Sequence, residues 1–178
     1  MTARPPRPPT SPSCPDTEPD PHSVARAIVL RQLALAARTR AQLQATLRRR
    51  GCPDEVAAAV LDRMAEVGLV DDAAFAQDLV QSRRRTKGLA GAALRRELRD
   101  KGVADDVAAE AVGPADELAE RARAERLVAR RLAAMGGLDP QVQARRLAGM
   151  LARKGYSPGT AYRVVRDAVN AAPEHQRD

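Results

Sequence analysis

Arginine and lysine are the residues of this 178-residue chain whose number and spacing could do chemistry. They total 30 against 23 acids, giving a formal net charge of +7, and only Lys87, Lys101 and Lys154 are lysines. The guanidinium group of arginine binds phosphate and carboxylate through paired hydrogen bonds. The excess lies between Ser23 and Asn170, where 27 basic residues face 18 acidic ones. This distribution predicts a basic surface that binds a nucleic acid or an acidic protein.

The basic residues are grouped in blocks along the chain. Residues 54–78 hold seven acids and one base, whereas residues 83–101 hold eight bases and two acids. Coding bias can explain the choice of arginine over lysine, and local pairing can make any single block a solvated helix face. Neither explains why the blocks recur, so a binding surface is favoured. The residues predicted to bind the partner or nucleic acid are Arg48, Arg49, Arg50, Arg83, Arg84, Arg85, Lys87, Arg95, Arg96, Arg99, Lys101, Arg145, Arg146, Arg153 and Lys154.

Residues suited to catalysis or metal binding are few. The two histidines, His22 and His175, lie near the chain ends, and the two cysteines form no metal-ligand spacing. The sequence contains no phosphate-binding loop motif and no nucleophile-elbow motif. The acid pairs Asp71–Asp72 and Asp105–Asp106 precede predicted helices, where carboxylates act as caps and dipole partners. We therefore expect no catalytic residues, no metal and no cofactor.

A phrase of Leu-x3-Leu-x3-Gly occurs three times and identifies the elements that must position the bases. The copies begin at Leu43, Leu94 and Leu147, and their glycines are 51 and 53 residues apart. Leucines four residues apart share one helix face, and a glycine four residues later is typical of the left-handed turn that ends a helix. A fixed period predicts one structural unit built three times. The residue before each glycine is basic: Arg50, Lys101 and Lys154.

Each unit is predicted to contain three helices, and no stretch alternates as a strand would. The predicted fold class is therefore all-α, with tandem repeats of three-helix units, about nine helices, in an elongated, curved array. The repeats are predicted at residues 23–69, 70–113 and 114–170. Residues 1–22, which hold most of the 13 prolines, are predicted to be a disordered tail, and residues 171–178 a frayed end. A single compact bundle of nine helices is the alternative.

Capping residues mark where several of these helices begin. Thr39 and Gln42 form a T-x-x-Q capping box. Asp139–Pro140 and Ser157–Pro158 each combine an N-cap residue with proline at the first helical position. These local signals predict helix starts directly after residues 39, 139 and 157.

The core must be built from alanine, leucine, valine and methionine, because the chain has one phenylalanine, two tyrosines and no tryptophan. The repeat predicts that Leu47, Leu98 and Leu151 occupy equivalent core positions. Phe75 is predicted to anchor the contact between the first and second repeats.

Three stretches resemble the RecX family of regulatory proteins. Gly68-Leu-Val-Asp-Asp-Ala-Ala-Phe75-Ala76 resembles its G-Y-(I/L)-(D/N)-D-x-x-(F/Y)-A segment. Thr39 to Gly51 resembles its S-x-x-E-L-x-x-x-L-x-x-(K/R)-G element, and Gly88 to Gly102 resembles its middle repeat. The likeness covers roughly residues 23–168. Leucine replaces the usual tyrosine after Gly68, and glutamine replaces the acid of the capping box, so the departures affect packing and capping.

This resemblance implies tandem three-helix repeats and a regulator of recombination and the SOS response. Such a protein binds the RecA recombinase filament and lowers its ATPase, strand-exchange and coprotease activities. The expected partners are RecA and single- and double-stranded DNA without strong sequence preference. The chain is expected to be a cytoplasmic monomer. No membrane contact is expected, because no apolar run approaches the ~20 residues of a membrane span. A free-standing helix-turn-helix-like DNA-binding protein, or a helical adaptor for an acidic protein, are the alternatives.

Overall fold

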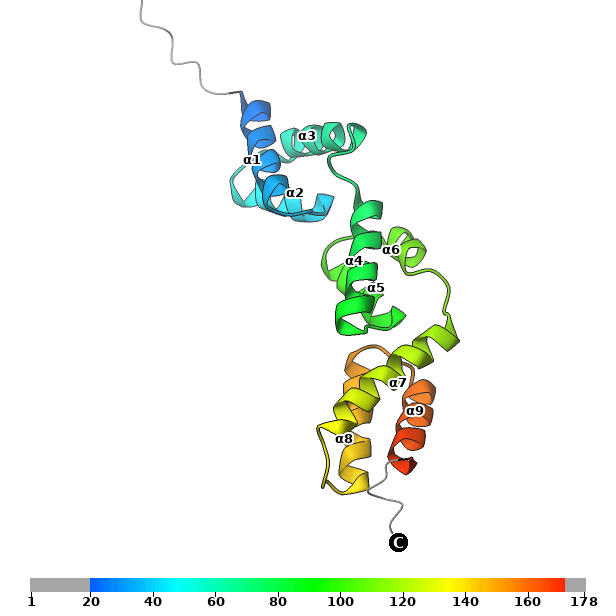
Figure 1. The fold of residues 1–178 in the computed structure, drawn as a ribbon. Helices are drawn as coiled ribbons and strands as arrows, with labels where there is room; N and C mark the ends of the chain where they lie inside the picture. The colour runs from blue at the N-terminus through cyan, green and yellow to red at the C-terminus, as the bar shows by residue number, and fades with distance from the viewer. Residues whose placement is uncertain (1–19, 172–178) are drawn as a thin grey trace, which may run out of the picture.

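The computed structural model describes residues 20–171, and within this range the chain forms nine α-helices and no strand. Figure 1 shows the helices following one another in an elongated array, in which α3, α6 and α9 lie to the right in this view. The all-α fold class is confirmed. The helices are α1 (Pro21–Leu35), α2 (Arg40–Arg49), α3 (Asp54–Glu66), α4 (Asp72–Lys87), α5 (Gly91–Asp100), α6 (Asp105–Val112), α7 (Glu117–Ala133), α8 (Pro140–Arg153) and α9 (Pro158–Asn170).

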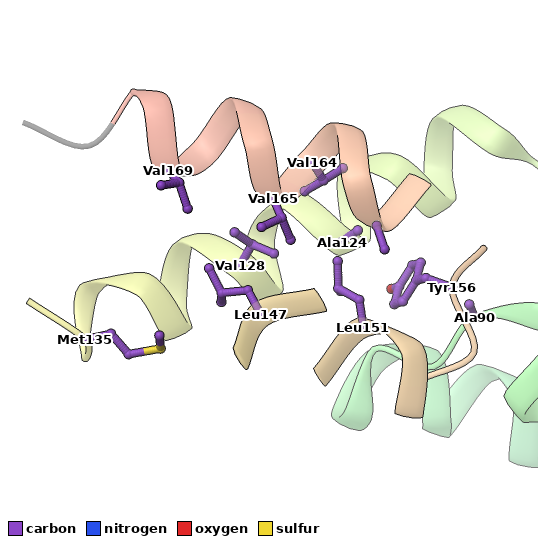
Figure 2. Close-up of a cluster of buried hydrophobic side chains, with 11 residues drawn as sticks. Ala90, Ala124, Val128, Met135, Leu147, Leu151, Tyr156, Val164, Val165 and Val169 are labelled. Carbon is purple, nitrogen blue, oxygen red and sulfur yellow. The ribbon is translucent and has the colours of Figure 1, made fainter. Parts of the chain in front are cut away.

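Three successive helices form each unit: α1–α3 are unit one, α4–α6 are unit two and α7–α9 are unit three. Helices pack mainly within their own unit, and each unit has its own cluster of buried apolar side chains. Figure 2 shows the cluster of unit three, where Leu147 and Leu151 of α8 meet Val164 and Val165 of α9. The predicted core role of the repeat leucines is confirmed, because all six are at most 1% exposed: Leu43, Leu47, Leu94, Leu98, Leu147 and Leu151.

The predicted caps are present. Thr39 accepts a hydrogen bond from the Gln42 backbone N–H, and the Gln42 side chain accepts one from the Thr39 N–H, so the capping box at α2 is complete. Asp139 caps α8 through the N–H groups of the first turn, and Ser157 caps α9 in the same way. These helices begin where local chemistry predicts because a capping side chain reaches only two or three residues along the chain.

One boundary differs from the prediction. Pro21 and His22, predicted as the end of a disordered tail, belong to α1, because the Asp20 carboxylate accepts hydrogen bonds from the N–H groups of His22 and Ser23. Helix α4 continues to Lys87 and stops at Gly88, whose φ of +59° is left-handed. The rest of the predicted tail and of the frayed C-terminal end lies outside the described residues.

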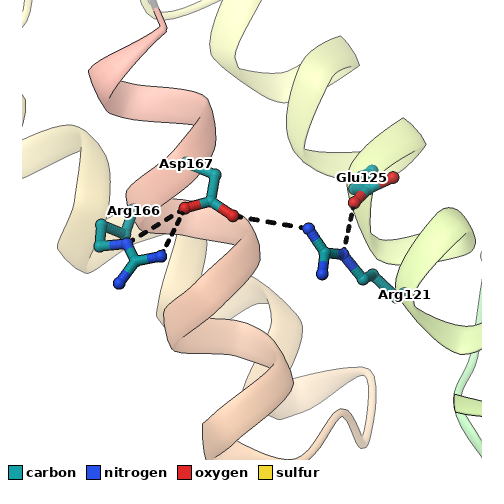
Figure 3. Close-up of polar contacts among 4 residues, drawn as sticks. All are labelled: Arg121, Glu125, Arg166 and Asp167. Carbon is teal, nitrogen blue, oxygen red and sulfur yellow. Dashed lines mark hydrogen bonds and ion pairs between the residues drawn. The ribbon is translucent and has the colours of Figure 1, made fainter. Parts of the chain in front are cut away.

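An ionic cluster joins α7 to α9 on the outside of unit three (Figure 3). The guanidinium of Arg121 contacts Glu125 at 2.8 Å along α7 and Asp167 of α9 at 3.5 Å, and Arg166 contacts Asp167 at 2.8 Å. All four side chains are about half exposed, so the cluster contributes little stability beyond that of the apolar cluster beneath it.

Phe75 is half-buried and packs on the apolar cluster of unit two. It also lines a shallow groove with Arg38 and Gln42 of unit one. It therefore lies at the boundary between the units, as predicted, but the close contacts that join them come from other residues, described next.

Candidate basic interface

Neighbouring units are joined by a carboxylate that binds the start of a helix. In α4, Asp72 Oδ1 accepts a hydrogen bond of 2.8 Å from the backbone N–H of Arg40. In α7, Glu120 Oε1 accepts one of 2.9 Å from the backbone N–H of Gly91. Arg40 and Gly91 are the first residues of α2 and α5, where helix N–H groups lack internal partners and the helix dipole favours a negative charge. The same junction is thus built twice.

A second hydrogen bond joins the units at each junction. The Thr39 hydroxyl donates to the Lys101 carbonyl at 2.6 Å, and the Ala90 N–H donates to the Lys154 carbonyl at 2.9 Å. Thr39 and Ala90 are the N-cap residues of α2 and α5. Lys101 and Lys154 are the residues before the repeat glycines, so the repeated sequence phrase lies against the preceding unit.

The repeat glycines are needed for this close approach. A Cβ on Gly102 would lie 2.3 Å from Ala41 Cβ, and a Cβ on Gly155 would lie 2.5 Å from Ala93 N, so neither position has room for one. All three repeat glycines also have left-handed φ, between +75° and +86°. At Gly51, in the first of the described units, a Cβ would meet nothing within 4 Å. Glycine therefore ends a helix in all three units but joins units only at the second and third copies.

Two of the basic residues that were predicted to lie on one free surface take part in these junctions. Lys101 and Lys154 are half-buried, and the Lys154 ammonium group also donates to the Lys87 carbonyl at the end of α4. Burial, followed by the nearby charges of Arg130 and Lys87, lowers the pKa of Lys154. Lys154 therefore has a structural role through its side chain, whereas Lys101 takes part in its junction through its backbone carbonyl.

Tyr156 completes this end of the second junction. Its hydroxyl donates to the Gly88 carbonyl at 2.9 Å, and burial of the ring raises the pKa of the phenol. The carbonyl groups at the C-terminus of α4 thus receive donors from unit three.

Arg83 and Arg84 also hold the fold together. Arg83 Nε lies 2.7 Å from Glu97 of α5 in a salt bridge whose side chains are only 28% and 23% exposed. Arg84 Nη2 donates to the Val112 carbonyl of α6 at 2.7 Å. Both arginines tie α4 to another helix of unit two, so replacing them would disturb that unit as well as any binding surface.

The other predicted basic residues are exposed. Of these, Arg48 lies 3.3 Å from Asp54 and Arg99 lies 3.9 Å from Asp105, while the others have no acid within 4 Å in the part of the chain that the structure describes. The exposed set, which we call the basic surface residues, is Arg48, Arg49, Arg50, Arg85, Lys87, Arg95, Arg96, Arg99, Arg145, Arg146 and Arg153.

A cleft of about 720 Å³ lies between units two and three, beside this junction. Arg84 and Arg95 line it from unit two, and Arg123 of α7 lines it from unit three. Arg123 was not among the predicted residues, because it belongs to no basic block and comes close to the others only through the junction. The sequence signal that could have indicated this part of α7 is Glu120, which takes the same junction role in unit three as Asp72 does in unit two.

Comparison with known proteins decides the family. Family models for the RecX first, second and third three-helix domains match residues 25–64, 71–112 and 119–165. The chain is 55% identical over 152 residues to a regulatory protein RecX from Thermobifida fusca, covering 85% of this chain and 82% of that protein. It is 48% identical over 179 residues to one from Mycobacterium avium, covering 99% of both. The chain belongs to the RecX family.

A solved RecX structure has the same fold. The crystal structure of RecX from Lactobacillus salivarius superposes with a TM-score of 0.73 at 17% sequence identity, covering 83% of this chain and 96% of that one. The tandem three-helix arrangement is therefore that of RecX, and the alternative of a single compact nine-helix bundle is not adopted.

The two acids of the segment that resembles RecX have different structural roles. Asp71 caps α4 by accepting a hydrogen bond of 2.8 Å from the Ala74 N–H, whereas Asp72 forms the junction with unit one. Within residues 20–171, no group of three or more side chains could hold a metal ion. No helix in that range is both long and apolar enough to cross a membrane.

Proposed function

We propose that this RecX-family chain binds the RecA nucleoprotein filament and lowers its ATPase, strand-exchange and coprotease activities. It does so as a cytoplasmic monomer that catalyses no reaction of its own. RecA and the DNA of the filament, read without strong sequence preference, are its partners. The observation that carries the proposal is the repeated junction, because it builds an elongated array with unpaired basic side chains on successive units.

The basic surface residues suit contacts with phosphates and with acidic protein side chains. Nine of the eleven have no acid within 4 Å among the described residues, so their charge is available to a partner. Contacts with the phosphate backbone position a protein on nucleic acid without reading its sequence. A long basic array can therefore lie along a helical filament and contact both its protein and its DNA.

The test is ATP turnover by purified RecA on single-stranded DNA. We expect the wild-type protein to lower turnover, and a variant with Arg85→Ala, Lys87→Ala and Arg96→Ala to need about tenfold more protein or more for the same effect. These side chains are exposed and hold no part of the fold. Arg83 and Arg84 are left intact, because they tie unit two together.

A matched control removes the same charge elsewhere. Arg26, Arg31 and Arg163 are exposed and lie outside the basic surface residues, so their triple replacement by alanine is expected to inhibit as the wild type does. Equal inhibition by the two triple variants would refute the surface assignment. Failure of the wild type to lower turnover would refute the function.

A further inference from the structure

The cleft between units two and three has an unusual concentration of arginine. Arg84 of α4, Arg95 of α5 and Arg123 of α7 line it, and apolar residues such as Val112 and Pro158 form other parts of its wall. Its volume of about 720 Å³ lies in the range of sites that bind small organic ligands. The arginines come from both units, so a molecule bound there would contact both.

None of the three guanidinium groups forms an ion pair in the described part of the chain. Arg84 is held by the Val112 carbonyl, and its Nε is buried without a hydrogen-bond partner. The Nε of Arg123 is likewise buried without a partner. Arg95 is exposed and has no acid within 4 Å. Three guanidinium groups that line one cleft, none of them in an ion pair, favour the binding of an anion.

Two acids also line the cleft and reduce its charge, so with its three arginines the lining carries a net charge of +1. Asp116 caps α7 by accepting a hydrogen bond of 2.9 Å from the Ala119 N–H. Glu120 accepts the junction hydrogen bond from Gly91. Both carboxylates are thus committed to backbone N–H groups.

We propose that this cleft binds a phosphoryl group, with Arg84, Arg95 and Arg123 as its ligands. Arginine matches phosphate because its planar fork donates two parallel hydrogen bonds to two oxygens. The phosphate comes from the nucleic-acid backbone or from a free phosphorylated molecule. In the first case the inference deepens the proposed function, since the filament supplies the nucleic acid, but its test needs no RecA.

The experiment is calorimetric titration of the full chain with inorganic pyrophosphate, and separately with a six-residue oligothymidylate. We expect Arg95→Gln to weaken pyrophosphate binding about tenfold or more, because it removes a charge-assisted contact. Since Arg95 is exposed, the variant keeps its fold, which circular dichroism verifies. Arg123→Gln should weaken binding in the same way.

The control is Arg131→Gln, which removes an exposed arginine from the same helix as Arg123 but outside the cleft. It should bind pyrophosphate as the wild type does. If the oligonucleotide and pyrophosphate compete, and Arg95→Gln weakens the binding of both, backbone phosphate is identified as the source. Loss of pyrophosphate binding alone would identify a free phosphorylated ligand. Absence of pyrophosphate binding by the wild type, or equal effects of Arg95→Gln and Arg131→Gln, would overturn the proposal whatever the outcome with RecA.

Discussion

The buried side chain of Thr39 both caps a helix and joins two units. The residue is fully buried, its hydroxyl oxygen accepts a hydrogen bond from the Gln42 N–H, and the hydroxyl donates to the Lys101 carbonyl of the next unit. The capping role was predictable because a cap acts over three residues. The junction role was not, since its partner lies 62 residues away and local spacing carries no information about it.

Replacing Thr39 by valine is expected to lower the free energy of unfolding by about 2 kcal/mol. The change removes a helix cap and leaves the partly buried Lys101 carbonyl without its donor. Thr39→Ser keeps the hydroxyl and should cost under about 1 kcal/mol. Urea denaturation of the two variants measures the difference, and equal losses would show that the hydroxyl does not matter.

Tyr156 gives a prediction for alkaline pH. Burial raises its pKa in the folded state, so the folded chain keeps the phenolic proton to higher pH than the unfolded chain does. The phenol therefore contributes stability that is present below the ordinary pKa near 10.0 and is lost as the pH rises through the higher folded value.

The measurement compares wild type with Tyr156→Phe at several pH values. At neutral pH the variant should be less stable by about 1 kcal/mol, because the hydrogen bond to the Gly88 carbonyl is lost. The difference should shrink as the pH rises above 10.0. Tyr162→Phe, which removes an exposed hydroxyl, is the matched control. A difference that widens with pH would contradict the stated role of burial.

At the scale of the helix, short local signals predict several starts and, at the three repeat glycines, the ends of α2, α5 and α8. Helices α2, α8 and α9 begin at the predicted residues because Thr39, Asp139 and Ser157 cap them through short local hydrogen bonds. Helix α4 instead ends where Gly88 becomes left-handed and where Lys154 and Tyr156 of unit three bind its last carbonyl groups. Gly88 is a local signal for this end, whereas the donors from unit three lie 67 and 68 residues away and could not be predicted locally.

The repeat leucines carry the stability prediction for the helices. Leu98→Ala should lower the free energy of unfolding by about 2–5 kcal/mol, because it opens a cavity in the fully buried cluster of unit two. Leu47→Ala and Leu151→Ala should cost similar amounts. Leu118, which is 82% exposed, is the control, and Leu118→Ala should change stability by less than about 0.5 kcal/mol. Chemical denaturation measures these free energies of unfolding. If the three repeat-leucine variants lose no more stability than Leu118→Ala, the predicted core role of the repeat leucines is wrong.

At the scale of the whole molecule, the period predicted a tandem array, and charge counts predicted a basic one. Charge counts could not show which bases are free. The side chains of Arg83, Arg84 and Lys154 are half-buried and bind their own chain. Arg123 lines the cleft without belonging to any basic block. Separating these roles requires knowing how the units lie against one another.

DNA binding by the free protein should be salt-dependent and nearly indifferent to sequence. On duplex DNA the logarithmic slope of affinity against salt is about −0.9 per phosphate contacted, so affinity should fall steeply as salt rises. Binding selection from random duplexes should return a flat preference. A sharp consensus, with one duplex bound about a thousandfold tighter than others, would instead favour a helix-turn-helix-like DNA reader.

The close packing of a repeat glycine against the preceding unit is tested most directly by a double-mutant cycle in urea denaturation. Gly51→Ala should cost about 1 kcal/mol, for its left-handed backbone alone, whereas Gly102→Ala should cost at least about 2 kcal/mol more, because its Cβ would clash with Ala41. Adding Ala41→Gly should recover about 1 kcal/mol or more in the Gly102→Ala background and nothing in the Gly51→Ala background. Equal costs for the two glycine variants, with strict additivity in both cycles, would contradict the junction.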